Sequence, residues 1–366
     1  MKNFASVALV WLSPLLIPLP ASADELVLPA PALRALGLRP VRHAPVLSRA
    51  THPDPTPGTL WPVTFKSQAH SIAQNYVQHQ DYGGGQYYHG GCDLRTVARS
   101  WAVAPIDGVL EGGYYGYETQ ADGQDVKWWK PWDGSPEASL YFELAVVSDD
   151  GYRYELHHVD PMTLPQETVR WLDQGGVRVT AGAKLAHVAK WPGDYDHVHF
   201  NLVRPDGVHV NPEAFSQALP VIVDSIAPRI LAAFTIDAQN RVAALRDGAR
   251  IAANVTEIVV ETTETRDGNA YVQTPPLFQA RFDSGEVTGE DFRKTLTGAD
   301  GAWRDIRQVF LPKLRTPSGA TIRNAGNYGE GQFLVRIPLP RTAHGPFEVR
   351  LEDTAGNAAV LRATRD

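Results

Sequence analysis

Two short stretches of the chain carry residues that could hold a metal ion. His89 and Asp93 are four positions apart in the first stretch, and His197 and His199 are two positions apart in the second. Side chains two residues apart on a β-strand lie on the same face, so both imidazoles of the second stretch would face one surface. His89 and Asp93, on a turn that runs into a strand, could converge on the same point. Two imidazoles and one carboxylate form a three-ligand zinc set that leaves a position for a catalytic water.

Neither pair is specific alone, because the chain contains 12 histidines and either spacing can arise by chance. A histidine in a loop or on a solvated strand face is the ordinary interpretation of a lone motif. The surrounding sequence reverses that interpretation. Gly90 and Gly91 follow the first histidine, and an apolar run over 101–109 comes next. Phe200 and a further apolar stretch follow the second pair.

The ordered set of motifs over roughly residues 61–215 resembles the lysostaphin/LytM-type zinc endopeptidases, which cut the peptide part of bacterial cell walls. The matching segments are 89–93, 102–109, 158–159 and 197–200. Two details depart from the family pattern. Residues 190–195 replace a Gly/Ser/Thr-rich approach to the last motif, and Cys92 stands where the family usually has an aliphatic residue.

The resemblance implies a site of five residues. His89, Asp93 and His199 would bind one Zn²⁺, and the zinc would activate a water for attack on a peptide bond. His197 would act as general base, and His158 would orient the water or stabilise the oxyanion. Neutral imidazoles near their intrinsic pKa suit proton transfer at physiological pH. The implied substrate is the stem peptide or cross-bridge of peptidoglycan.

Two other functions remain open. One is a LytM-like module that binds the cell wall or regulates a partner without cutting, although such proteins usually lack some of the five residues. The other is a zinc carboxypeptidase of the D-Ala-D-Ala type, whose His–Asp spacing is wider than that of His89 and Asp93. The sequence contains no His-Glu-x-x-His motif, which argues against the thermolysin-like class.

Residues 1–23 have the pattern of a secretory signal peptide. Lys2 supplies an early positive charge, a proline-broken apolar run extends to Leu19, and 21–23 has the small-x-small pattern of a cleavage site. The apolar run is too short for a membrane span. We expect cleavage after Ala23, a secreted or periplasmic location and no stable membrane insertion.

Residues 24–60 contain seven prolines, which predicts an extended arm. The arm would be either a simple tether or a propeptide-like segment lying over the groove.

Removal of residues 1–23 takes away one lysine and no acidic residue, so the mature net charge is 33 − 41 = −8. This acidic balance, without a basic run, argues against a nucleic-acid partner. A monomer is the expected state.

Cys92 is the single cysteine of the chain. An exported protein can form disulfides, but Cys92 has no partner within the chain. It lies between two candidate ligands, yet its neighbour Asp93 would point to the opposite face of a strand. We therefore expect Cys92 to be a small buried apolar residue and not a zinc ligand.

The expected fold class is mainly β. Residues 61–220 would form an antiparallel β-groove of the LytM, duplicated-hybrid-motif-like type, and 221–366 an immunoglobulin-like β-sandwich. The sandwich is predicted from short alternating segments separated by Gly, Asn and Asp turns. No catalytic cluster occurs in this second domain, so a fragment ending near Asp224 is expected to fold alone.

Three local elements of the first domain bear on the site. The segment 140–159 is predicted to form a β-hairpin around an Asp-Gly turn, and it carries His157 and His158. As strand neighbours these two would face opposite sides, with His158 on the active-site side by the family pattern. The aromatic segment 112–139 is expected to be a long loop that forms a groove wall or packs on itself. A short helix is predicted over 165–175.

Overall fold

The computed structural model describes residues 33–34, 37–40, 60–63, 72–81, 86–215, 224–267, 271–298, 302–324 and 331–366. The expected signal peptide and most of the proline-rich arm lie outside these residues. Within the described part of the chain, no helix is long and apolar enough to cross a membrane.

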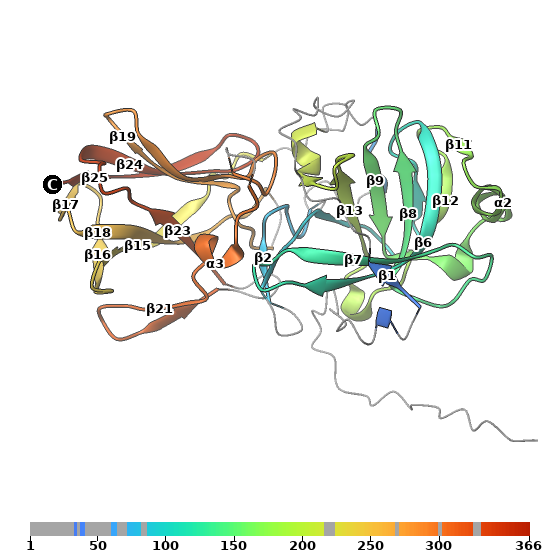
Figure 1. The fold of residues 1–366 in the computed structure, drawn as a ribbon, viewed down its shortest axis with the longest axis horizontal. Helices are drawn as coiled ribbons and strands as arrows, with labels where there is room; N and C mark the ends of the chain where they lie inside the picture. The colour runs from blue at the N-terminus through green and yellow to red at the C-terminus, as the bar shows by residue number, and fades with distance from the viewer. Residues whose placement is uncertain are drawn as a thin grey trace, which may run out of the picture.

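Strands dominate the described chain, which confirms the mainly β fold class. Figure 1 shows two lobes side by side, the first built from strands up to Val210 and the second from strands that begin at Arg229. The predicted short helix is confirmed as α2 (Gln166–Gln174), and it ends at Gly175, which has a φ of 63°. The other helical segments are short: η3 (Pro161–Thr163), η4 (Pro192–Asp194), η5 (Pro212–Phe215) and α3 (Ile306–Val309).

The first lobe is organised around a nine-stranded antiparallel sheet. Its strands are β1 (Arg39–Pro40), β4 (Cys92–Arg95), β6 (Gly108–Thr119), β7 (Asp125–Pro131), β8 (Phe142–Val147), β9 (Arg153–His157), β11 (Arg178–Val179), β13 (His197–Val203) and β14 (His209–Val210). The order is β1-β7-β6-β8-β9-β13-β14, with β11 paired to β6 and β4 paired to β13. A second sheet holds β10 (Val159–Asp160), β12 (Lys184–Val188) and β5 (Trp101–Val103), and a small ribbon holds β2 (His79–Gln80) and β3 (Tyr87–Tyr88).

The aromatic segment 112–139 is largely a hairpin, so the prediction of a long loop was wrong. β6 and β7 pair from Gly113 to Thr119, because tyrosine and tryptophan side chains suit a half-buried pleated surface. Tyr115 and Tyr117 both contact the ring of His157, with centroids 4.1 and 6.1 Å away. The hairpin therefore forms a wall beside the histidines.

Leu33 of the proline-rich arm packs on the other face of this hairpin. Leu33 is fully buried, and it lies where a side chain on Gly116 would be. Gly116 alternates with Tyr115 and Tyr117, so this contact is on the face away from His157. Leu33 thus anchors the arm behind the sheet and not over the histidines.

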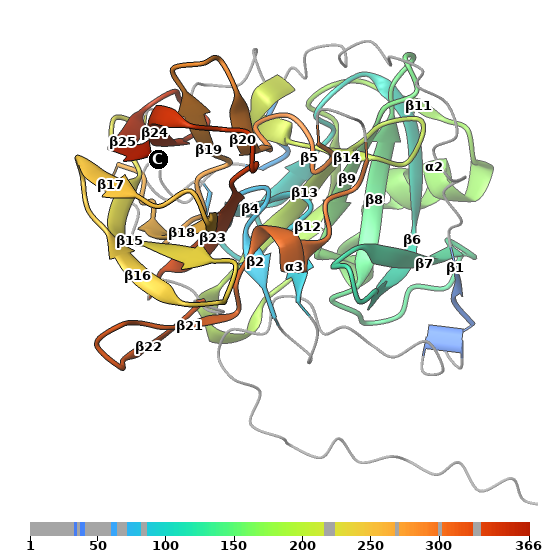
Figure 2. The same cartoon turned by 60° about the vertical axis from the view of Figure 1, so that its left-hand side comes forward.

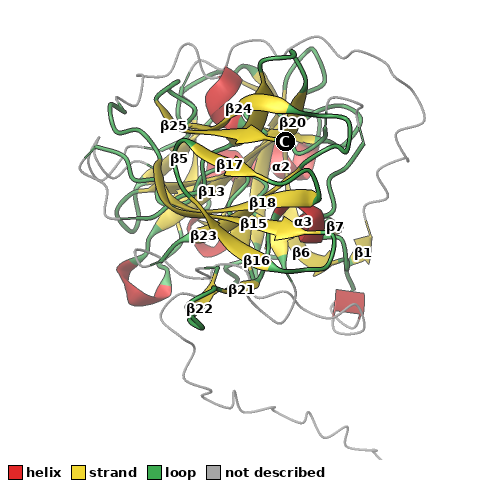
Figure 3. Cartoon of the chain, turned by 90° about the vertical axis from the view of Figure 1, so that its left-hand side faces the viewer, coloured by secondary structure: helices red, strands yellow, loops and turns green. Residues whose placement is uncertain are grey.

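The second lobe is a sandwich of two sheets, seen as two layers in Figure 3. Ile258 and Val260 lie in the shared core, while Val259 between them packs on the outer face against Leu314. This alternation confirms the predicted sandwich pattern. One sheet contains β16 (Val242–Leu245), β15 (Arg229–Asp237), β18 (Val255–Thr263) and β23 (Phe333–Pro338); the other contains β17 (Ala249–Ile251), β25 (Ala358–Arg365), β24 (Gly345–Glu352), β19 (Leu277–Phe282) and β20 (Val287–Asp291). The hairpin of β21 (Lys313–Arg315) and β22 (Thr321–Arg323) lies outside both sheets.

The two lobes share a buried interface. Tyr88 of β3 packs against Phe292, Trp303 and Phe310 of the second lobe, with ring centroids 5.5 to 6.0 Å apart. His79 of β2 packs on Phe310 at 5.2 Å. Residues of both lobes therefore belong to one hydrophobic core. This interface argues against the expectation that a fragment ending near Asp224 folds alone.

The tip of the β6–β7 hairpin adds a second contact between the lobes. The tip contacts Ile306, the first residue of α3, and Figure 2 shows α3 next to β2 at the boundary between the lobes. The backbone N–H of Ile306 donates to the carbonyl of Asp122 over 2.9 Å. Gly123 has a φ of 83°, and a Cβ there would lie 2.7 Å from the side chain of Ile306. Glycine is required for both the backbone conformation and the close approach.

Burial of His79 predicts a pH-dependent stability. Burial lowers the pKa of His79 to about 4, against a smaller opposing effect of Asp81. The unfolded state therefore binds a proton between pH 6.5 and about 4 that the folded state excludes, and stability falls as the pH falls through this window. Wild type should lose about 2 kcal/mol more than His79→Gln between pH 7.5 and 5.0, measured by urea unfolding. Equal losses in the two proteins would contradict the assignment.

Candidate metal centre

Strand register brings the two motif stretches together. β13 lies between β4 and β9, and the pairing places His199 directly opposite Asp93 and Asn201 opposite Glu155. Directly opposed residues of antiparallel strands have Cβ atoms about 4.5–5.5 Å apart. His89 precedes β4, and its backbone N–H donates to the carbonyl of Gln78 over 2.8 Å. His89, Asp93 and His199 therefore meet on one face of the sheet.

The ligand atoms of these three residues converge on a single carboxylate oxygen. Asp93 Oδ1 lies 3.0 Å from His89 Nε2 and 3.0 Å from His199 Nδ1. Two ligands of a tetrahedral zinc, each about 2.0–2.1 Å from the ion, lie roughly 3.3 Å apart. All three residues are buried, and their ligand atoms lie within 4.8 Å of one another. The separations suit a small cation held between the three groups.

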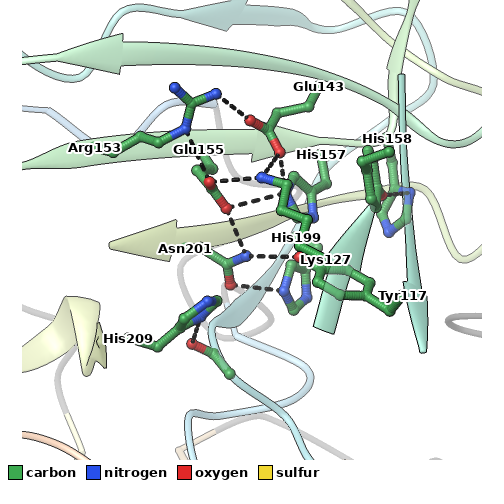
Figure 4. Close-up of polar contacts among 12 residues, drawn as sticks. Tyr117, Lys127, Glu143, Arg153, Glu155, His157, His158, His199, Asn201 and His209 are labelled. Atoms are coloured by element: carbon green, nitrogen blue, oxygen red, sulfur yellow. Dashed lines mark hydrogen bonds and ion pairs between the residues drawn. The ribbon is translucent and has the colours of Figure 1, made fainter. Parts of the chain in front are cut away.

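Hydrogen bonds on the far side of each ring determine which of its nitrogens carries the proton and which faces Asp93 with a lone pair. His89 Nδ1 lies 2.9 Å from the carbonyl of Asn75, so this nitrogen carries the proton and donates. His199 Nε2 lies 2.8 Å from Oδ1 of Asn201, whose amide group donates to Glu155 over 3.1 Å. Figure 4 shows this chain from His199 through Asn201 to Glu155. In the neutral rings His89 Nε2 and His199 Nδ1 are therefore lone pairs directed at Asp93.

Three acceptors that point at one another repel unless a cation or a proton lies between them. The arrangement is the one found in metal sites, where each ligating histidine donates its other N–H to a carbonyl or another oxygen. Two imidazoles and a carboxylate fit Zn²⁺ by donor type. The residues present therefore fit the expected metal.

The charge of Asp93 suits a ligand. Burial by itself raises the pKa of Asp93, but positive charge on His89 and His197 and hydrogen bonds from protonated rings would outweigh it and hold the pKa well below its usual value. With neutral rings, a bound cation would supply this positive charge. The hydroxyl of Tyr195 donates to Oδ2 of Asp93 over 3.2 Å. Asp93 is thus held ionised with one oxygen engaged by Tyr195 and the other facing the histidines.

His197 and His158 lie together beside this cluster. Their ring centroids are 4.8 Å apart, and His197 Nε2 lies 3.9 Å from Oδ2 of Asp93. His197 Nδ1 donates to the carbonyl of Tyr195 over 2.6 Å, and His158 Nδ1 donates to that of Leu140 over 2.8 Å. Burial lowers the pKa of both histidines, so both are neutral near pH 7. All five expected site residues are therefore brought into one cluster.

His157 also lies on this side of the sheet, which the alternation rule did not predict. Its ring stacks on His199, with centroids 5.2 Å apart, and lies 6.2 Å from the ring of His158. His158 has a φ of 61°, and this left-handed backbone breaks the strand just after His157. The expectation that the two neighbours face opposite sides was wrong because His158 is not in strand conformation.

A buried ionic cluster lies beneath His199. His157 Nε2 lies 2.7 Å from Glu143, and Lys127 contacts both Glu143 and Glu155. Arg153 contacts the same two carboxylates. The two carboxylates are balanced by one lysine and one arginine, so this group does not require a metal ion although its oxygens and His157 lie close together. It holds Glu155 in place as the acceptor for Asn201.

Aromatic residues of segment 190–195 pack over the two neighbouring histidines. Trp191 lies with its ring centroid 4.4 Å from His158 and 5.0 Å from His197. Tyr195 lies 4.6 Å from His197 and 5.9 Å from Tyr271 of the second lobe. The segment that departs from the family pattern thus encloses the site, and the second lobe extends to it.

Cys92 lies on the opposite face, as strand alternation predicts. It is fully buried in the hydrophobic core, and burial raises the pKa of its thiol well above the usual value. Its sulfur lies 4.0 Å from Glu213 and does not belong to the His89 cluster.

Sequence reasoning missed three residues that orient the cluster. Asn201 could have been found, because it is two residues after His199 on the same strand face. Asn75 acts through its backbone carbonyl, which has no sequence signal. Tyr195 lies in a turn whose path the sequence does not show.

Comparisons with known proteins found a structural similarity but no family. No family model matches the chain, and no curated protein matches it. A solved structure titled "Structure of the SpoIIQ-SpoIIIAH pore forming complex" is similar over 45% of this chain and 94% of the other, with 16% identity and a TM-score of 0.29. A similarity at this level carries no argument about function.

Removal of the Asn201 amide should weaken metal binding. Asn201→Ala leaves His199 Nε2 without its acceptor and releases the ring from its ligating tautomer. The zinc Kd should rise about 10- to 100-fold, measured by competition with a chromophoric chelator. Asn254→Ala, which removes an exposed amide of the second lobe, should leave the Kd unchanged. An unchanged Kd in Asn201→Ala would show that His199 binds without this hydrogen bond.

Proposed function

We propose that the protein is an exported zinc metalloendopeptidase that hydrolyses peptide bonds in peptidoglycan. The observation that carries the proposal is the convergence of His89, Asp93 and His199 on one point, with two further neutral histidines beside it. The substrate class is supported by the resemblance of the four ordered motifs. Export is supported by the pattern of residues 1–23.

His89, Asp93 and His199 would hold the zinc. When bound, the zinc supplies a Lewis acid that polarises the scissile carbonyl and lowers the pKa of a water ligand. The rings of His89 and His199 are already fixed in the required tautomers, so binding needs no reorientation. Preorganisation of this kind lowers the cost of assembling the site.

His197 would accept the proton of the attacking water. Its Nδ1–H is engaged by the Tyr195 carbonyl, which leaves Nε2 as the basic nitrogen on the side of Asp93. His158 has the same tautomer, because its Nδ1–H donates to Leu140. A neutral His158 therefore accepts at Nε2 and would orient a water; it could stabilise an oxyanion only after protonation.

The second candidate is a LytM-like wall-binding or regulatory module that does not hydrolyse. The observation that favours it is burial, since His158 and His197 are each 1% exposed. Trp191 packs against both rings. Hydrolysis therefore requires displacement of aromatic side chains when substrate binds, whereas a closed site would hold zinc for structural reasons alone.

Substitutions should distinguish the zinc ligands from the proton-transfer residues by their effects on zinc content and turnover. His89→Ala, Asp93→Ala and His199→Ala should each lose most of the one zinc per chain, measured by inductively coupled plasma mass spectrometry. His197→Ala and His158→Ala should keep the zinc and lose about 100- to 10,000-fold in turnover on purified peptidoglycan.

His344→Ala, an exposed histidine of the second lobe, serves as the matched control and should keep both zinc and turnover. A zinc-loaded wild type that releases no peptide products, detected by mass spectrometry, would support the non-hydrolytic candidate. Loss of zinc in His197→Ala together with retention in His199→Ala would contradict the ligand assignment.

A further inference from the structure

A second group of acidic side chains lies in the other lobe, far from the histidines in sequence. Carboxylate oxygens of Asp224, Glu264 and Asp353 lie within 4.8 Å of one another. Asp224 is the first described residue after segment 216–223, Glu264 follows β18, and Asp353 follows β24. Glu264 and Asp353 are buried, at 1% and 0% exposed.

Glu264 is the anomaly of this group. Its backbone is satisfied, because its N–H and carbonyl both bond to Gln273, over 3.1 and 2.8 Å. Its two carboxylate oxygens are buried and have no hydrogen-bond partner among the described residues. A buried charge without a partner costs several kcal/mol, so this carboxylate requires a proton or a cation.

The nearest protein cation is already engaged elsewhere. Arg266 donates to both oxygens of Glu213, over 2.7 and 2.8 Å, and through Nε to Gln273 over 2.7 Å. The four carboxylates of Asp224, Glu264, Asp353 and Glu213 against one guanidinium leave a net charge of 1 − 4 = −3. Burial raises the pKa of Asp224 to about 6 and raises those of Glu264 and Asp353, although the charge of Arg266 lowers all three.

The other two carboxylates are held in position by donors from their own loops. Asp353 accepts from the backbone N–H and the side-chain amide of Asn357, each over 2.8 Å. The same amide donates to the carbonyl of Asp224 over 2.9 Å, and Ile226 N–H donates to its carboxylate over 3.1 Å. Asn357 therefore joins the start of the lobe to the loop after β24. It fixes the Asp353 carboxylate and the backbone of Asp224, whose own carboxylate is held by Ile226.

We propose that Asp224, Glu264 and Asp353 form a binding site for Ca²⁺. The donors are all oxygen, which calcium prefers, and no histidine or cysteine belongs to the group. Two oxygens bound to one calcium at about 2.3–2.6 Å can lie up to roughly 5 Å apart, and the observed separations fall within this limit. The site is independent of the zinc centre and of the proposed hydrolysis.

Calcium at this position would stabilise the junction between the lobes. It would join the chain entering the second lobe, the end of β18 and the loop after β24. Arg266, two residues after Glu264, connects the same region to Glu213 of η5 in the first lobe. Removal of calcium should therefore lower thermal stability without removing the zinc.

The test uses the full chain, loaded with one equivalent of zinc and freed of calcium, with calcium chloride as the only addition. Isothermal titration calorimetry should give one calcium per chain, with a Kd near the range of extracellular modules, about 10⁻⁴–10⁻³ M. The Tm should rise by about 5 °C when calcium is a hundredfold above its Kd.

Glu264→Gln keeps the shape of the side chain and removes the charge. It should lose the calcium response and should be at least as stable as wild type without calcium. Asp224→Asn, at a half-buried position, should raise the Kd for calcium at least tenfold. Asp283→Asn, an exposed acid elsewhere in the lobe, should respond as wild type does.

Three results would overturn the proposal. A wild-type Tm that does not change with calcium would identify Glu264 as a buried neutral acid. A full calcium response in Glu264→Gln would place the ion elsewhere. An equal rise with magnesium chloride at the same concentration would refute the assignment to calcium.

Discussion

The structure of the candidate site depends on one constraint: two imidazole lone pairs and a carboxylate oxygen meet at 3.0 Å inside the protein. This contact is repulsive without a positive charge between the atoms. It persists because a hydrogen bond on the far side of each ring fixes its orientation. His89 bonds to the Asn75 carbonyl and His199 bonds to the side chain of Asn201. The ionic cluster of Lys127, Glu143, Arg153, Glu155 and His157 holds Glu155 where it accepts from Asn201 (Figure 4), so a charge network in the sheet supports the candidate metal centre.

The segments that position the site residues also contact the second lobe. Asn75, whose carbonyl orients His89, donates through its side chain to the carbonyl of Thr274 in the second lobe over 2.8 Å. Gln273 donates to the carbonyl of Ile72 over 2.8 Å, and Arg95 of β4 contacts Tyr271. The loop that positions His89 is thus braced by the second lobe. A sandwich that carries none of the five site residues still helps to set their geometry.

Strand alternation was sufficient to predict the shared face of His197 and His199 and the opposite orientation of Cys92, because these follow from local geometry. The mainly β class followed from the same patterns. The aromatic hairpin was missed because the strand-forming tyrosines of β6 are interleaved with glycines, as in a loop. His157 was misplaced because a single left-handed residue, His158, breaks the alternation. Contacts between Tyr88 and Phe292 join residues about two hundred positions apart, and no local pattern records them.

The central claim is that the converging lone pairs hold zinc with two imidazoles and one carboxylate. X-ray absorption at the zinc edge, on the full chain loaded with one equivalent of zinc, tests it most directly. The account predicts a shell of nitrogen and oxygen atoms at about 2.0–2.1 Å, with outer-shell scattering from two imidazole rings. A sulfur atom at about 2.3 Å, which only Cys92 or a methionine could supply, or a third imidazole from His197, would contradict it.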